Sequence, residues 1–317
     1  MRRFRIRRRR LAALALLPLA ALTATTMITV AAGAAGNAEI ETSKRTVRYG
    51  GQLTVRGSFP GATNDPVTIQ RRAKGAGAWR DVRGAQTDAN GFYSARVKPR
   101  RTGDWRARLA GSPDTLSTDG SEVPATSAAS ETRAARVAVR SRTRANVAHR
   151  HLTVGRAARI KGHVLPGGAG RRVTVHVGGR SVETRTDRDG SFSARWRARS
   201  TGSYKVHVSS ARNRVAAGSS DSAGKVTVYR GASASWYGPG LYGNPMACGG
   251  TLTPSTLGVA HRSMPCGTKL LLRYHGRSVK VRVVDRGPFA GNREFDLTAA
   301  TKRRLGFGST GTVLSSK

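Results

Sequence analysis

Residues 269–289 read KLLLRYHGRSVKVRVVDRGPF, and this stretch decides how the C-terminal region folds. Apolar residues dominate both sides of the His275-Gly276 pair, which predicts a strand over 269–274, a tight turn, and a returning strand over 278–284. Asp285 then leaves the second strand in front of a rigid Gly-Pro pair. The stretch therefore predicts a β-hairpin with a carboxyl group held at the end of one strand.

The residues around this hairpin complete a small closed barrel. On the N-terminal side, aromatic residues and glycines crowd together over 236–243. On the C-terminal side, residues 294–297 lead into a short helix expected over 298–305, and a last strand is expected over 310–314. Five or six short strands and one helix leave no room for a larger core, and closing the sheet removes its exposed edges.

An internal repeat precedes the barrel. The segment TDANGFYSAR at 87–96 recurs as TDRDGSFSAR at 186–195. Asn90-Gly91 and Asp189-Gly190 predict tight hairpin turns, because glycine tolerates a positive φ. Short strands with turns at this spacing predict two β-sandwich units, similar in architecture to the immunoglobulin-like domains of bacterial surface proteins.

The expected fold class is all-β. Two tandem immunoglobulin-like β-sandwich units are expected at 39–140 and 141–230, followed by a six-stranded barrel with a short helix at 231–317. Neither sandwich contains a cysteine or a cluster of titratable residues with site-like spacing. We expect them to act as spacers or adhesive modules, and we expect residues 112–132 to form a long polar loop.

The chain of 317 residues carries 56 Lys and Arg against 17 Asp and Glu, a formal net charge of +39. This charge has two explanations: an arginine-rich coding bias expressed on a solvated surface, or attraction to anionic polymers outside the membrane. The basic residues do not gather into one stripe, so a specific nucleic-acid partner is not expected. Anionic wall polymers are retained as a further partner.

Residues 1–36 have the order of a secretory signal. Arginines fill most of the first ten positions, an apolar run covers 11–32, and small residues follow at 31–35. The alternative is an uncleaved anchor, since the run is about long enough to span a bilayer, and membrane attachment is expected only in that case. No cysteine stands directly after the segment, so we expect a secreted or cell-wall protein and not a lipoprotein.

Cys248 and Cys266 are the two cysteines of the chain. In an exported protein an even number of cysteines predicts a disulfide. Closing a loop of this length would stabilise the domain by about 3 kcal/mol in the chain-entropy description.

Five separated motifs carry a resemblance. They are ASWYG at 234–238, GVAH at 258–261, residues 265–267, VDRGPF at 284–289 and FDL at 295–297. In this order and spacing they resemble the RlpA-like double-psi β-barrel family, which includes the septal ring lytic transglycosylases and is related in fold to expansins. The resemblance covers about residues 232–316 and implies that the barrel is a double-psi β-barrel.

The resemblance also implies an activity, the cleavage of peptidoglycan glycan strands to 1,6-anhydro ends, preferably strands without stem peptides. A carboxylic acid protonates the glycosidic oxygen as an oxocarbenium-like centre develops. The sugar's own 6-hydroxyl then closes the anhydro ring in place of water, so one carboxyl group can serve as acid and then as base. No metal or cofactor is implied.

Three residues are candidates for the catalytic site. Asp285 is the first choice for the acid, and the alternative is a turn aspartate that accepts backbone N–H groups. Asp296 aligns with the important acid of expansins, and its alternative role is a helix N-cap. His261 matches the family's Ala-His motif and would orient an acid or bind sugar, with a structural hydrogen bond as the alternative.

Three further residues are candidates for substrate binding. Trp236 and Tyr237 would stack on sugar rings, and core packing is the alternative for one of the two. Ser235 would contribute a hydroxyl to the groove.

Two departures from the family pattern leave catalysis open, although enzyme function is favoured. Counting back from His261, Gly250 stands where many members carry Glu, and Thr253 stands where they carry Asp. Cys248 and Cys266 would clamp the same loop, and ACGG at 247–250 is similar to expansin-like proteins, which loosen walls without hydrolysis. The alternatives are a non-catalytic expansin-like wall-binding or wall-loosening module and a basic secreted scaffold that binds anionic wall polymers.

Overall fold

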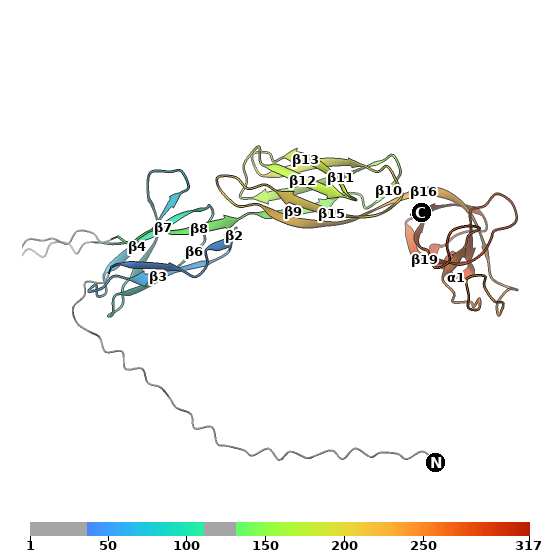
Figure 1. The fold of residues 1–317 in the computed structure, drawn as a ribbon, viewed down its shortest axis with the longest axis horizontal. Helices are drawn as coiled ribbons and strands as arrows, with labels where there is room; N and C mark the ends of the chain where they lie inside the picture. The colour runs from blue at the N-terminus through green and yellow to red at the C-terminus, as the bar shows by residue number, and fades with distance from the viewer. Residues whose placement is uncertain (1–36, 111–130) are drawn as a thin grey trace, which may run out of the picture. The chain divides into compact units, whose positions relative to one another are not determined.

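The computed structural model describes residues 37–110 and 131–317. The expected signal segment and most of the expected polar loop lie outside these ranges. The regular secondary structure of the described chain is β-strand apart from one short helix, α1 (Ala299–Leu305), as Figure 1 shows. The all-β prediction is confirmed at this level. Within the described ranges, no helix has the length and apolar character needed to cross a membrane.

The first repeat consists of two sheets around a shared core. The smaller sheet has the order β1 (Glu39–Thr42), β3 (Leu53–Ser58), β6 (Phe92–Val97). The larger has the order β2 (Thr46–Arg48), β8 (Ala135–Arg140), β7 (Gly103–Leu109), β4 (Pro66–Ala73), β5 (Arg80–Gln86). Alternate residues of both sheets point inward, and the core centres on Leu53, Ile69, Tyr93 and Trp105.

The second repeat is built in the same way. Its smaller sheet has the order β14 (Ser191–Arg197), β11 (Ala157–Leu165), β9 (Arg142–Val147). Its larger sheet contains β13 (Arg180–Arg185), β12 (Arg172–Val177), β15 (Gly202–Ser210) and the first part of β16 (Ser219–Tyr237), to which β10 (His151–Thr153) adds in parallel. Ile160, Val175, Trp196 and Val208 are among its buried residues.

The two Gly turns of the repeat are present and are closed like hairpin turns, but the strands on either side of each turn do not pair with each other. Gly91 N–H donates to Asp88 O, and Gly190 N–H donates to Asp187 O, which closes each turn locally. The strand before each turn belongs to the larger sheet, however, and the strand after it belongs to the smaller sheet. The turn residues determine where the chain reverses, whereas tertiary packing determines which strands then pair.

Six strands close the C-terminal barrel. In order they are β16, β20 (Phe295–Thr298), β17 (Gly258–Ala260), β19 (Arg277–Asp285), β18 (Lys269–Tyr274) and β21 (Gly311–Ser315), and β21 returns to pair with β16. The predicted hairpin is present as β18 and β19, with both turn residues at positive φ. Buried side chains such as Leu272, Phe295 and Leu297 fill the interior.

One strand serves two structures. β16 runs for 19 residues without a break. Its residues up to Val228 pair with β15 of the second repeat, and those from Arg230 pair with β21 of the barrel. The expected boundary near residue 230 therefore falls inside a continuous strand.

Candidate functional site

The barrel contains a cavity of about 250 Å³ that brings together two of the predicted acids. Asp285 from the end of β19 and Asp296 from β20 both line it, together with Tyr237 from the end of β16. The remaining lining residues are largely apolar or belong to loops, and among them are Leu241, Met246, Leu252, Pro288 and Phe289. Asn244 and Arg286 also line the cavity, so polar and apolar groups share its wall. A pair of carboxyl groups in a small hollow is an arrangement that shifts protonation equilibria.

Asp296 is the carboxyl group whose surroundings favour a bound proton. It is half-buried, and this desolvation raises its pKa, against smaller opposing effects of the Ser235 hydrogen bond and of Arg293. The Ser235 hydroxyl donates to Asp296 Oδ1 over 2.7 Å. The alternative role as helix N-cap is wrong, because the cap of α1 is Thr298, whose hydroxyl accepts from Thr301 N–H.

Asp285 has different partners. Its Oδ1 accepts hydrogen bonds from the backbone N–H of Ala247 at 2.8 Å and of Arg286 at 2.9 Å. The turn-like structural role considered for this residue is therefore present, and it holds the carboxyl group at the cavity wall. The proposed catalytic role of Asp285 stays a prediction.

Tyr237 and Trp236 point in opposite directions, because successive side chains on a strand alternate. Tyr237 lines the cavity, and its buried hydroxyl has no hydrogen-bond partner among the described residues. Burial first, and then the charges of Asp285 and Asp296, raise the pKa of Tyr237. Trp236 instead packs against the barrel core, with the Lys302 amine 3.6 Å from its ring centre.

His261 does not line the cavity that holds Asp285 and Asp296. Its Nδ1 accepts from the backbone N–H groups of Ser263 and Met264, which leaves Nε2 to carry the proton of the neutral ring. Burial lowers the pKa of His261 against the opposing charge of Glu294. Nε2 lies 3.8 Å from Glu294 Oε1, and Glu294 also forms an ion pair with Arg230.

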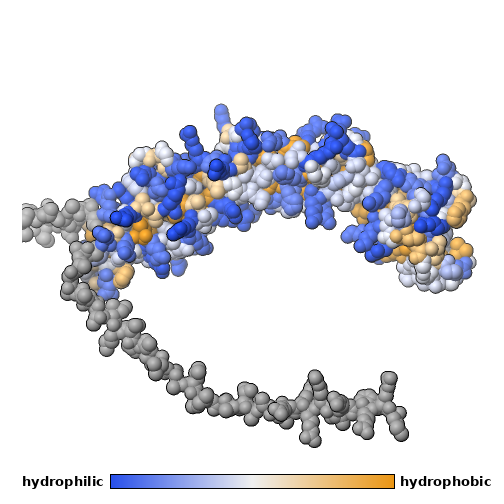
Figure 2. Space-filling view, viewed as in Figure 1, coloured by the Kyte–Doolittle hydropathy of each residue, from blue (hydrophilic) through white to orange (hydrophobic). Residues whose placement is uncertain are grey.

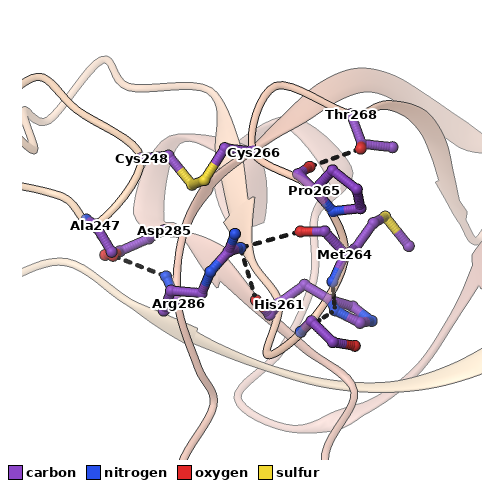
Figure 3. The surroundings of a disulfide bond; sticks show 10 residues. Ala247, Cys248, His261, Met264, Pro265, Cys266, Thr268, Asp285 and Arg286 are labelled. Atoms are coloured by element: carbon purple, nitrogen blue, oxygen red, sulfur yellow. Dashed lines mark hydrogen bonds between the residues drawn. A yellow bond between two sulfur atoms is a disulfide. The ribbon is translucent and has the colours of Figure 1, made fainter.

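A disulfide joins Cys248 to Cys266 and closes a separation of 18 residues. Figure 3 shows how it borders the site: Ala247, next to Cys248, donates to Asp285. Arg286 reaches across to the carbonyl oxygens of His261 and Met264, at 3.3 and 3.0 Å. The disulfide loop therefore helps to set the position of Asp285.

Residues 229–314 match a protein-family model described as lytic transglycolase. The C-terminal domain is an RlpA-like double-psi β-barrel. The RlpA-like domain accounts for the order and spacing of the five motifs.

Relatives of the RlpA-like domain carry names that state an activity. A probable endolytic peptidoglycan transglycosylase RlpA of Synechocystis is 42% identical over 93 residues, which cover 29% of this chain and 29% of that protein. The endolytic peptidoglycan transglycosylase RlpA of Campylobacter jejuni is 40% identical over 82 residues, covering 25% and 30%. The chain thus matches less than a third of the length of these relatives.

One solved structure shows a distant likeness to part of the chain. The Yersinia pseudotuberculosis adhesin InvE shares 9% identity with a TM-score of 0.29, covering 61% of this chain and 59% of that chain.

Two features of the RlpA-like domain escape prediction from the sequence. Glu294 was not expected beside His261; it lies just before β20 and outside the five motifs, so the sequence carries no specific signal for it. The second is the backbone at Gly250, whose φ of +75° favours glycine and would strain a glutamate at this position. Thr253 instead binds its neighbours Ser255 and Thr256 through its hydroxyl.

Proposed function

We propose that the RlpA-like domain is a lytic transglycosylase that cleaves peptidoglycan glycan strands to 1,6-anhydro ends, with Asp296 as its acid and base. The observation that carries the proposal is the raised pKa of Asp296 in a cavity shared with Asp285 and Tyr237. The names of the relatives support the substrate class. A preference for strands without stem peptides follows from the family resemblance.

In the reaction Asp296 gives up one proton and then takes up another. Protonated Asp296 gives its proton to the glycosidic oxygen as the bond to the anomeric carbon breaks, and positive charge develops on the sugar. The resulting carboxylate then takes the proton of the sugar's 6-hydroxyl, whose oxygen bonds to the anomeric carbon. The Ser235 hydroxyl fixes Oδ1, so the other carboxyl oxygen carries the proton.

The remaining residues of the cavity would position the sugar. Asp285, held by two backbone N–H groups, lies where its charge would stabilise the oxocarbenium-like centre. Phe289 and Leu241 are 83% and 44% exposed beside the cavity and offer surfaces for sugar C–H groups. Figure 2 shows apolar residues gathered on the visible face of the barrel.

The proposal includes the location of the domain. We infer export through cleavage of residues 1–36, with the two repeats as immunoglobulin-like spacers between the barrel and other wall components. Cleavage removes seven arginines and no acid, and the remaining net charge of +32 favours attraction to anionic wall polymers as well. Intact-mass measurement of protein from the culture medium tests cleavage; a full-length mass would contradict it.

A non-catalytic expansin-like module is the second candidate. Gly250 and Thr253 take the positions of two family carboxylates, and a disulfide braces their loop. Such a module would bind glycan in the same cavity without producing anhydro ends.

One experiment separates these functions. The full chain is incubated with peptide-free glycan strands, and 1,6-anhydro-muramyl ends are measured by mass spectrometry. Product should form, Asp296→Asn should reduce its rate at least a hundredfold, and Glu183→Gln, the same carboxyl-to-amide change on exposed β13, should leave the rate unchanged. Absence of product together with sedimentation onto intact walls would support the expansin-like module, and an unaffected Asp296→Asn rate would remove Asp296 from the mechanism.

A further inference from the structure

The outer face of the smaller sheet of the second repeat is strongly basic. Its alternate, outward residues include five exposed cations from all three strands, β9, β11 and β14: Arg144, Arg159, Lys161, Arg195 and Arg197. Residues two apart on a strand are roughly 7 Å apart, so these charges form a compact two-dimensional array. We call this array the β11 face.

The β11 face has little counter-charge. Within the described ranges, none of its five cations forms an ion pair with a carboxylate. Asp189 binds His163 at the turn that leads into β14, and Asp221 accepts from Ala145 N–H beside β9. Asp187 lines the same end of the face. The anionic groups thus lie at its margins.

The first repeat provides an internal comparison. Gly57 and Gly162 hold equivalent places, because each pairs with the aromatic residue of the repeated motif, Tyr93 or Phe192. Counting from these pairs, Glu39 stands where the β11 face has Arg144, and Thr54 stands where it has Arg159.

The corresponding face of the first repeat is therefore mixed in charge. Arg56 is the residue equivalent to Lys161. It forms an ion pair with Glu41 and donates a hydrogen bond of 2.8 Å to the Glu41 carboxylate. An arginine-rich coding bias would act on both repeats alike, so it does not explain a basic face on one of them only.

Repulsion between the charges of the array destabilises the folded repeat. Arg159 lies directly opposite Arg195 in the antiparallel pair of β11 and β14. Like charges in this position destabilise a sheet. The equivalent pair in the first repeat is Thr54 and Arg96, which avoids the repulsion. A bound polyanion would relieve it.

We propose that the β11 face binds a flexible polymer of phosphodiester-linked polyol, the anionic kind of wall polymer. Guanidinium groups match phosphate oxygens in pairs, and four of the five cations are arginines. A shallow hollow of about 670 Å³ at one end of the face is lined by two of the cations, Arg144 and Lys161, and by Asp187. Asn146, Ser191 and Ser193 also line it and offer partners for polyol hydroxyls. The choice of a wall polymer rests on the proposed export, whereas the binding itself does not.

Nucleic acid fits the face less well. Single-stranded nucleic acids bind where aromatic side chains stack on bases beside a basic groove. Among the outward residues of β9, β11 and β14, His163 is the aromatic one, and Asp189 binds it at the edge of the face. Leu165 is apolar, the others are cationic, amide, hydroxyl or small, and the rings of Phe192 and Trp196 point into the core.

The test compares equivalent substitutions in the two repeats. Binding of the full chain to purified poly(glycerol phosphate) is measured at low and at high salt. Lys161→Gln with Arg195→Gln should weaken binding about tenfold at low salt and should lower the salt dependence. Arg56→Gln with Arg96→Gln removes two positive charges from the equivalent positions of the first repeat and should change the affinity less than twofold. Both variants keep residues 1–36, so any binding through the arginines of that segment is the same in both.

Three results would overturn the proposal. Equal losses for the two double variants would make binding a property of net charge. Tighter binding of poly(dT) than of poly(glycerol phosphate) would indicate a nucleic-acid face, and equal binding of poly(glutamate) would remove the preference for phosphate. Arg159→Thr adds an independent readout: it should weaken binding yet raise the thermal midpoint of the free protein, and a lowered midpoint would contradict the repulsion argument.

Discussion

Asp285 and Asp296 share a cavity, but their carboxyl groups have different surroundings. Two backbone N–H groups bind one oxygen of Asp285, which fixes its position. Asp296 receives one hydroxyl hydrogen bond and is otherwise desolvated, which favours its protonated form. Neighbouring carboxyl groups with unequal surroundings are a common basis for dividing acid and electrostatic roles.

The raised pKa of Asp296 predicts a specific pH dependence of stability. The folded protein holds this proton more tightly than the unfolded chain, so the contribution to the free energy of unfolding is complete below the ordinary value of 3.8 and is lost as pH rises through the folded pKa. Asp296→Asn should therefore become more stable relative to the natural protein as pH rises. Urea denaturation at several pH values measures this difference.

The matched control is Glu183→Gln, a carboxyl-to-amide change on an exposed strand. If the burial of Asp296 is responsible, the pH-dependent gain in stability should be seen for Asp296→Asn and not for this exposed substitution. A parallel curve for Asp296→Asn would show that Asp296 titrates normally, and the role of this residue as acid would lose its support.

Glu294 predicts a measurable shift at His261. The Glu294 charge opposes the burial that lowers the pKa of His261, so Glu294→Gln should lower that pKa further. An NMR titration of the His261 ring protons measures the change. The ring of His163, bound to Asp189 in the second repeat, is the internal control and should titrate as before; an unchanged His261 would mean that Arg230 alone neutralises Glu294.

At the level of strands, one glycine organises the smaller sheet of each repeat. A Cβ built on Gly57 would lie 1.9 Å from Glu39 O, and one built on Gly162 would lie 2.2 Å from Arg144 O and 2.5 Å from the Phe192 ring. The missing side chain makes room for the aromatic ring that covers the neighbouring strands. The same requirement in both repeats explains why the glycine accompanies the motif.

Gly162→Ala should therefore destabilise the second repeat by about 1–3 kcal/mol, because strand β9 and the Phe192 ring would both have to move. Gly84→Ala on exposed β5 is the control, since its Cβ would meet nothing within 4 Å. It should change stability by less than about 1 kcal/mol. Hydrogen exchange of β11 amides separates the effect from unfolding elsewhere, and equal protection in both variants would refute the packing argument.

The sequence predicted elements whose determinants are local. The hairpin of β18 and β19 follows from its own turn residues, and its first strand was placed at the observed residues, Lys269–Tyr274. The sequence did not predict that the chain passes from one sheet to the other at Asn90-Gly91. The turn residues are the same whether or not the flanking strands pair with each other. At the site, the motifs identified Asp285 and Asp296. His261 lies outside their cavity because of the direction its side chain takes just after β17, and the motif does not determine that direction.

For the whole molecule, the charge of +39 makes the folded state sensitive to salt. Compacting so many like charges raises their mutual repulsion, and salt screens it. Raising the salt concentration from about 0.01 to about 0.15 M should increase the thermal midpoint by a few degrees. Differential scanning calorimetry measures this change, and a midpoint that falls with salt would show that ion pairs outweigh repulsion.

The continuous strand β16 has a consequence for protein turnover. Proteases bind extended backbone that is free to leave its neighbours, and such backbone is usually found between domains. Here the residues before and after position 229 are hydrogen-bonded in sheets on both sides, so the usual site for cutting one domain from the next is protected. In an environment rich in degradative enzymes, the barrel would remain covalently attached to its repeats until one of the two structures itself unfolds.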